Sequence, residues 1–246
     1  MDIEKLLASY FDNKLRVFPL DIDGKRVWVK RIVKNLPNPV AAAIYHAARR
    51  LTGKSNEAQA EHEIESLNAL RRHGFLTPEI LFRNQYYVVL SDIGQSLEAA
   101  LTLADPQSRA RIVTLAGTAL RKLHDADRWH GAARVHNMTL SGERIGFIDL
   151  ENTVDTWLPL PLRKFWDLWQ LGHSTAFFEP SVPLTETALR AYGANAVRRA
   201  LQAAAWLLIG PYLLLKPFQK RGKRELRQTL GCIAAIYRLH GKADCD

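Results

Sequence analysis

The hydrophobic pattern of the chain changes once along its length. In its first part, short runs rich in Val, Ile, Phe and Tyr are separated by turn residues, whereas beyond Gln95 apolar residues recur at helical spacing, as at Ile112 and Leu115. Short β-rich runs followed by long helical stretches are typical of an α+β fold. We therefore predict an α+β fold with two lobes, a small β-rich lobe over residues 1–94 and a helical lobe over residues 95–246.

The β-rich part predicts a hairpin, a helix and a second hairpin. Residues 15–32 read LRVFPLDIDGKRVWVKRI, and Asp23-Gly24 suits the two-residue type I′ turn that joins two strands. A helix over residues 56–74 should end at Gly74, because glycine adopts the left-handed conformation that closes many helices. Two short strands, about residues 79–83 and 86–91, should follow it.

Three further segments are predicted to be helical. They are a short amphipathic helix at the N-terminus, a helix opened by prolines between residues 35 and 55, and an apolar stretch, AAAWLLIGPYLLL, at residues 203–215. The last contains Gly210-Pro211 in its middle and is too short to span a bilayer, which needs about 20 apolar residues. It predicts a broken helix that is buried or lies at an interface.

Charge and cysteine content limit the partners and the compartment. The 246 residues carry a formal net charge of +9, which favours an anionic partner such as a phosphorylated glycolipid or an acidic membrane surface. No helix-turn-helix or RNA-binding motif is present, so we expect no nucleic-acid partner. The two cysteines, Cys232 and Cys245, offer neither a disulfide framework nor a metal spacing, which indicates a cytoplasmic protein.

Much of the positive charge lies in two places. Arg49, Arg50 and Lys54 form one group, and the run KPFQKRGKRELR at residues 216–227 directly follows the apolar stretch. An apolar anchor beside a basic cluster is the pattern of a protein that rests on the inner face of a membrane. A buried pair of C-terminal helices with a solvated basic loop explains the same residues, and the sequence leaves both interpretations open.

Five segments follow one another in an order that resembles the protein-kinase-like superfamily, and most closely its bacterial lipopolysaccharide-core branch, the Kdo and heptose kinases. The resemblance covers roughly residues 15–170. Its segments are RVWVKR around Lys30, EHEIESLNALRRHGFLTPEIL around Glu63, HGAARVHN from His130 to Asn137, FIDLEN around Asp149, and RKFWDLWQLGHS around Asp167.

The resemblance implies a role for each matched residue. Lys30 would hold the α- and β-phosphates of ATP with Glu63 as its partner, and Asn137 and Asp149 would hold Mg²⁺. His130 would support the catalytic loop, and Asp167 would brace that loop from below. The residue types suit the chemistry, since a triphosphate brings several negative charges that must be neutralised and aligned, and carboxylate and amide oxygens are hard ligands for magnesium.

The catalytic loop departs from the family pattern at one position. Ala132 stands where the family has the Asp that receives the proton of the acceptor hydroxyl. General-base help is worth roughly 10²–10⁴ in rate, so its loss slows a kinase without necessarily ending catalysis. His136 is a candidate substitute base, although a structural role is the more common one for a loop histidine, and Glu151 is either a substitute or a second metal ligand.

Two other departures concern the nucleotide. Nothing before Lys30 reads as a glycine-rich phosphate loop, and only Gly24 precedes it. Trp28 lies two residues before Lys30 on the same face of its strand, where kinases carry a small residue beneath the adenine. Its ring, which buries on the order of 200 Å², would either fill the nucleotide pocket or stack on the base.

These observations lead to one expected function and one principal alternative. The first is ATP- and magnesium-dependent phosphorylation of a sugar hydroxyl on a lipopolysaccharide-core or related envelope glycolipid. The second is a pseudokinase that acts as a binding or regulatory protein in envelope biogenesis. A kinase of a cationic small molecule such as an aminoglycoside fits less well, because the net charge of +9 opposes a cationic substrate.

Overall fold

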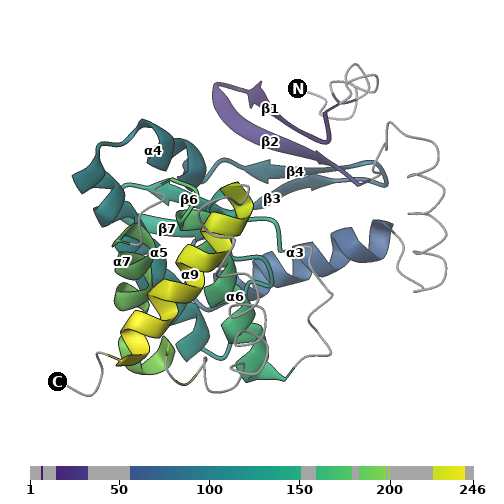
Figure 1. The fold of residues 1–246 in the computed structure, drawn as a ribbon. Coiled ribbons are helices and arrows are strands. Elements are labelled where there is room, and N and C mark those ends of the chain that lie inside the picture. The colour runs from purple at the N-terminus through teal and green to yellow at the C-terminus, as the bar shows by residue number, and fades with distance from the viewer. Residues whose placement is uncertain are drawn as a thin grey trace, which may run out of the picture. The chain divides into compact units, whose positions relative to one another are not determined.

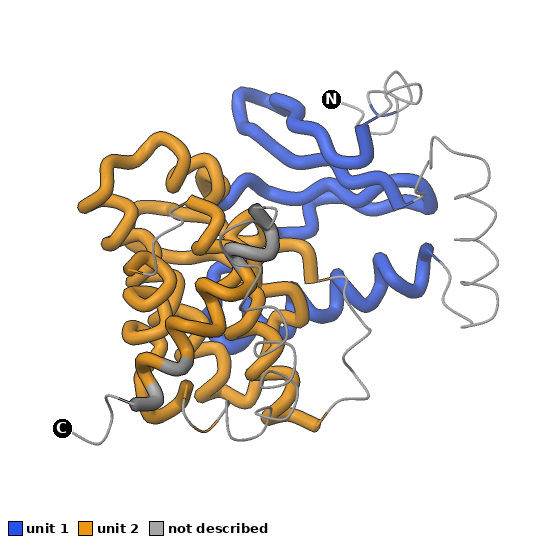
Figure 2. Tube along the Cα trace, in the orientation of Figure 1, with its two compact units in different colours: residues 1–93 blue, residues 94–246 orange. Residues whose placement is uncertain are grey.

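A computed structural model describes residues 7, 15–32, 56–150, 159–178, 183–197, 199 and 224–241. The chain divides into two compact units, Met1–Ile93 and Gly94–Asp246 (Figure 2). The first unit contains a β-sheet and one described helix, and most of the second is helical (Figure 1). The α+β class predicted from the sequence is therefore confirmed.

The first unit is built on a four-stranded antiparallel sheet. Its strands are β1 (Val17–Ile22), β2 (Lys25–Arg31), β3 (Ile80–Arg83) and β4 (Tyr87–Ser91), in the order β1-β2-β4-β3 (Figure 1). Asp23 and Gly24 join β1 to β2 with φ angles of 51° and 74°, as the predicted type I′ turn requires. The hairpin sets the register in which Lys30 lies opposite Val17 of β1, and on its other side Lys30 pairs with Val88 of β4.

The two faces of this sheet have different coverings. Strand residues alternate between faces, and one face holds an apolar cluster made by Leu7, Phe18, Leu20, Val27, Val29, Tyr87 and Val89. The other face packs on helix α3 (Asn56–Arg72) through a smaller cluster made by Ile32, Ala60 and Val88, with Ile64, Ile80 and Leu90 against it. Lys30 belongs to this second face, which is why its side chain points toward α3.

Helix α3 ends where the sequence predicts. Arg72 is its last residue, and Gly74 has a φ of 80°, a left-handed conformation that glycine adopts without strain. The Arg71 guanidinium donates to the carbonyl of Thr77 at 2.8 Å, and the Thr77 hydroxyl donates to Leu67 at 3.0 Å. These bonds fasten the end of the helix to the segment that leads into β3.

The second unit begins with a small sheet that the sequence did not predict in full. Its strands are β5 (Gln95–Ser96), β6 (Met138–Ser141) and β7 (Arg144–Phe147), in the order β5-β6-β7. Strand β5 begins at Gln95, where the sequence predicts the start of the helical lobe. Two residues are too few to show a strand pattern, and Ser96 also caps helix α4 (Leu97–Leu103) by accepting from Ala99 N at 3.1 Å.

Four longer helices make up the rest of the described part of this unit. They are α5 (Pro106–Asp125), α6 (Leu160–Thr175), α7 (Pro183–Tyr192) and α9 (Arg224–Gly241). The Asp105 carboxylate caps α5 by accepting from Gln107 N and Ser108 N at 2.9 and 3.0 Å. Helices α5, α6 and α9 each pack against α7, which gives the unit a single apolar interior.

Several predicted segments lie outside the described residues. They are the N-terminal helix apart from Leu7, the helix between residues 35 and 55, and the apolar stretch at 203–215 with most of the basic run after it. Leu7 itself is helical and buried. Among the described helices, none is long and apolar enough to cross a membrane.

The contact between α5 and α7 gives a stability prediction. A Cβ added at Gly117 of α5 would overlap the carbonyl oxygen of Ala188 in α7, whereas a Cβ at Gly231 of α9 meets nothing within 4 Å. In an open helix position Gly→Ala stabilises by about 1 kcal/mol, but overpacking costs about 1–3 kcal/mol. We expect Gly117→Ala to lower the free energy of unfolding in urea and Gly231→Ala to raise it. Equal effects of the two variants would contradict the close packing of α5 on α7.

Candidate functional site

Lys30 and Glu63 form a buried ion pair in the first unit. The Lys30 ammonium lies 2.7 Å from both carboxylate oxygens of Glu63, and the two side chains are 9% and 7% exposed. The predicted pairing of strand β2 with helix α3 through these two residues is therefore seen directly. This pair is the part of the candidate site that belongs to the first unit.

Local sequence explains how the pair forms. Glu63 shares a helix face with Ala60, Leu67 and Leu70, which recur at the spacing of a buried helical stripe.

A buried ion pair seldom adds net stability, because removing both charges from water offsets most of their attraction. An apolar pair would hold β2 and α3 together at least as well, so the retention of both charges points to a role in binding.

Trp28 lies on the same strand face as Lys30 and turns toward the end of β4. Its indole Nε1 donates to Asp92 Oδ1 at 3.2 Å. Because Trp28 pairs with Leu90 and Val27 pairs with Ser91, Asp92 lies beyond Trp28 on the side away from Lys30. The indole N–H is thus directed along the sheet face toward Asp92 and away from Lys30.

In the second unit, Asp167 of α6 holds the loop that starts at His130. The carboxylate is fully buried, and it accepts hydrogen bonds from the backbone N–H groups of His130 at 2.6 Å and Gly131 at 2.8 Å. Bonds to an ionised acceptor are the strong ones. The bracing role that the sequence resemblance implied for Asp167 is therefore present in the structure.

Two residues that the sequence did not single out complete this support. His124 of α5 lies between Asp167 and Tyr192 of α7, with Nε2 at 3.2 Å from Asp167 Oδ2 and Nδ1 at 2.7 Å from the Tyr192 hydroxyl. Burial raises the pKa of Tyr192 to about 12, so the phenol keeps its proton and can donate it to Nδ1. Helices α5, α6 and α7 are thereby joined through polar side chains beneath the loop.

His130 is held as a neutral imidazole inside the loop. Its Nε2 donates to the carbonyl of Asn137, and its Nδ1 accepts from the N–H of Ala132, each at 3.3 Å. A protonated ring would direct a second N–H against the N–H of Ala132. Burial lowers the pKa of His130 below its ordinary value, and the neighbouring charges of Asp167 and Asp149 only partly oppose this effect.

Asn137 and Asp149 lie at the same end of the β6–β7 pair. Met138 and Phe147 are strand partners, and Ile148 N donates to the carbonyl of Asn137 at 3.1 Å, so Asp149 follows directly beside Asn137. Asp149 has a φ of 62°, a left-handed conformation that is uncommon for a residue other than glycine. Such backbone strain is concentrated at functional sites.

These two residues fit a magnesium site of the kind that phosphotransferases use. The side-chain nitrogen of Asn137 donates a hydrogen bond to the carbonyl of Ala132 at 2.9 Å. The side-chain oxygen of Asn137 can therefore serve as a ligand for a cation. Among the described residues, no group of three His, Cys, Asp or Glu side chains could hold a metal ion. Magnesium at phosphotransfer sites is held by one or two protein ligands, with phosphates and water supplying the rest. Glu151, the third expected ligand, lies outside the described residues.

At the position where the family carries its catalytic Asp, this loop has Ala132 and therefore no carboxylate. Ala132 is half-buried, and its carbonyl accepts from Asn137 and from Arg134 N. The Arg134 guanidinium donates through Nε to Gln170 of α6, which is 6% exposed. His136 is exposed in the short helical turn Val135–Asn137, so the structure gives it no partner that would mark it as a base.

The residues predicted from the sequence thus form two groups. The structure brings Lys30 and Glu63 together in the first unit, and it brings His130, Asn137 and Asp149 together in the second. His136 is close in sequence but exposed. The sequence contained no spacing that would have identified His124, Tyr192 or Gln170, because their contacts join residues of separate helices.

Comparison with solved structures finds matches to 37 chains. No protein-family model matches the chain, and no curated protein matches it. Among solved structures, the chain is similar to WaaP in complex with acyl carrier protein, with a TM-score of 0.49 and 16% sequence identity over 80% of this chain and 82% of that one. At this level of likeness the activity of that protein does not transfer to this chain.

The neutral state of His130 predicts a pH dependence of stability. Because the pKa of His130 is lower in the folded than in the unfolded chain, its contribution is fully present above about pH 6.5 and is lost as the pH falls, by up to about 1.4 kcal/mol per pH unit. We expect His130→Gln to lose less of its free energy of unfolding than the wild type between pH 7.5 and 5. Parallel pH profiles of the two proteins, measured by urea unfolding, would show that His130 is not held neutral.

Proposed function

We propose that the protein is an ATP- and magnesium-dependent phosphotransferase that works without the usual catalytic-loop carboxylate. In this proposal Lys30, fixed by Glu63, contacts the phosphates of the nucleotide. Asn137 and Asp149 hold the magnesium ion, which would neutralise phosphate charge. The observation that carries the proposal is the buried Lys30–Glu63 pair at 2.7 Å, because such a pair has little value for stability alone.

The loop geometry supports the same proposal from the second unit. Asp167 and His130 hold the loop from beneath, and Asn137 is oriented by the carbonyl of the residue that replaces the base, Ala132. Phosphoryl transfer depends chiefly on alignment and on charge neutralisation rather than on covalent chemistry by the protein. A chain that keeps these parts and lacks the base is expected to transfer phosphate slowly.

Acceptor preference follows from charge and from the resemblance of the motifs. The net charge of +9 favours an anionic acceptor, and the motif order resembles that of the lipopolysaccharide-core kinases. We therefore propose a sugar hydroxyl of an anionic envelope glycolipid as the acceptor, reached from the cytoplasmic side of a membrane. The basic run at residues 216–227 would contribute to that contact.

A second candidate function rests on Ala132. A pseudokinase that binds a nucleotide and acts through a partner protein would keep the Lys30–Glu63 pair and the Asp149 conformation and would have no need of a base. Both candidates predict magnesium-dependent binding of ATP. They differ in whether phosphate is transferred.

The proposal is tested with variants of the two groups of residues. Asp149→Asn keeps the size of the side chain and removes its charge, and the double variant Lys30→Met/Glu63→Leu removes the ion pair without leaving a buried carboxylate unpaired. We expect both to lose the magnesium-dependent rise in melting temperature that ATP gives the wild type, since a ligand that binds only the folded state stabilises it. We also expect both to lose phosphate transfer to purified core glycolipid.

Lys122→Gln serves as the control, because Lys122 is an exposed lysine on α5. This variant should bind ATP and transfer phosphate as the wild type does. An ATP effect in the wild type without any transfer would favour the pseudokinase. Wild-type transfer by the Asp149 variant would exclude the proposed role of Asp149.

A further inference from the structure

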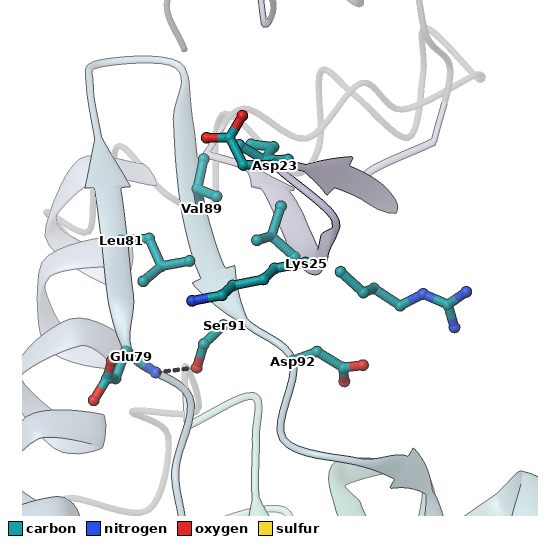
Figure 3. A pocket seen from close by; sticks show the side chains of 10 residues that line it. Asp23, Lys25, Glu79, Leu81, Val89, Ser91 and Asp92 are labelled. Atoms are coloured by element: carbon teal, nitrogen blue, oxygen red, sulfur yellow. Dashed lines mark hydrogen bonds between the residues drawn. The ribbon is translucent and has the colours of Figure 1, made fainter. Parts of the chain in front are cut away.

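The first unit contains a pocket that the proposed phosphotransfer does not use. It has a volume of about 590 Å³ and lies between the β1–β2 turn and the ends of β3 and β4 (Figure 3). Pockets that bind small molecules have volumes of roughly 300–1,000 Å³. Its described lining residues all belong to this one unit.

The floor of the pocket lies on the opposite face of the sheet from Lys30, although Arg26 and Asp92, which also line the pocket, are in step with the Lys30 face. Lys25 and Val27 line it, and both alternate along β2 with Trp28 and Lys30, whose side chains lie on the face that packs on α3. Val27 instead belongs to the apolar cluster of the other face. A ligand in this pocket would therefore be separated from the Lys30–Glu63 pair by the thickness of the sheet.

The floor of the pocket is aliphatic, and one part of it is exposed. Val27 and Val89 are 3% and 0% exposed, while Leu81 beside them is 47% exposed. The register of β3 against β4 shifts between Ile80 and Phe82, which is a bulge at Leu81. Bulges redirect a side chain and are over-represented next to binding sites, and this one leaves Leu81 on the pocket wall rather than in the core.

A cationic group faces this floor. Figure 3 shows the ammonium of Lys25 extending across the pocket toward Leu81 and Ser91. Two of the carboxylates on the pocket wall have partners elsewhere. Glu79 forms an ion pair with Arg71 at 2.9 Å, and Asp92 accepts the indole N–H of Trp28.

The remaining polar groups leave room for an anion. Asp23 points away from the Lys25 ammonium (Figure 3), and within the described part of the chain no carboxylate lies within 4.0 Å of that ammonium. The Ser91 hydroxyl oxygen accepts from Glu79 N at 2.8 Å, so its own O–H can donate to a ligand. Lys25 and Ser91 thus offer two donors above an aliphatic floor.

We infer that this pocket binds an amphipathic anion, a molecule with one carboxylate or phosphate head and a short aliphatic body. Lys25 and Ser91 would hold the head, and Leu81 with the two valines would cover the aliphatic part. Neither half of such a ligand has a complete site alone, because the lining combines two cationic residues, Lys25 and Arg26, with a small apolar surface. The inference does not depend on the proposed phosphotransferase activity, since it uses the other face of the sheet.

Calorimetric titration of the full chain with octyl phosphate, below its micelle concentration, tests this inference. We expect saturable binding of octyl phosphate that is much tighter than binding of inorganic phosphate or of octanol. Lys25→Gln and Leu81→Ser should each weaken it about tenfold, since each removes one of the contacts with the ligand. Both side chains are exposed, so these variants should keep the fold.

Lys122→Gln again provides the matched control and should bind octyl phosphate as the wild type does. ATP with magnesium should not displace the ligand, because the two sites lie on different faces. The inference is overturned if octyl phosphate gives no saturable binding, if Lys25→Gln and Lys122→Gln bind it equally, or if ATP competes for it.

Discussion

The buried carboxylate of Asp167 is the interaction on which the second unit depends. It lies at the centre of helix α6 and receives two backbone N–H groups of the loop and the imidazole of His124. A buried acceptor with this set of donors fixes the backbone of His130 and Gly131 in one conformation, because moving the loop would leave a charged group without partners. The geometry of His130, Asn137 and Asp149 follows from that constraint.

The first unit has a corresponding constraint in the Lys30–Glu63 pair. Strand β2 and helix α3 lie far apart in the sequence, and they meet through a buried charge pair and a neighbouring apolar cluster. Each unit therefore keeps charged groups inside its core, Asp167 as the acceptor for the loop and the Lys30–Glu63 pair at a place where apolar residues would pack as well. In the proposed function, these groups would bind and align phosphates. The loop carries Ala132 where the family has the Asp that would accept a proton.

Much of this could be predicted from the sequence because the signals were local. Asp23-Gly24 specified the hairpin and Gly74 the end of α3, whereas the pairing of Glu63 with Lys30 was implied by the resemblance of the motifs. The direction of Trp28 could not be predicted, because it depends on Asp92, which is 64 residues away. Strand β5 was missed because two residues carry no pattern.

Contacts between helices were also beyond local reasoning. His124 and Tyr192 meet across 68 residues, and nothing in either helix distinguishes these side chains from ordinary core residues. The same holds for the pocket beside Lys25, whose wall includes Leu81 at the register shift between β3 and β4. Sequence patterns predicted the elements and the charged motif residues, while the polar network beneath the loop required the packed structure.

The most direct test of the central claim is to restore the missing carboxylate. If the loop is held in a working geometry and lacks only the base, Ala132→Asp should raise the rate of phosphate transfer from ATP by roughly 10²–10⁴ while leaving the affinity for ATP with magnesium unchanged. The rate is measured as transfer of labelled phosphate to core glycolipid by both proteins at saturating ATP. A variant that folds and binds ATP as the wild type does but transfers phosphate no faster would contradict the claim that the base is all the loop has lost.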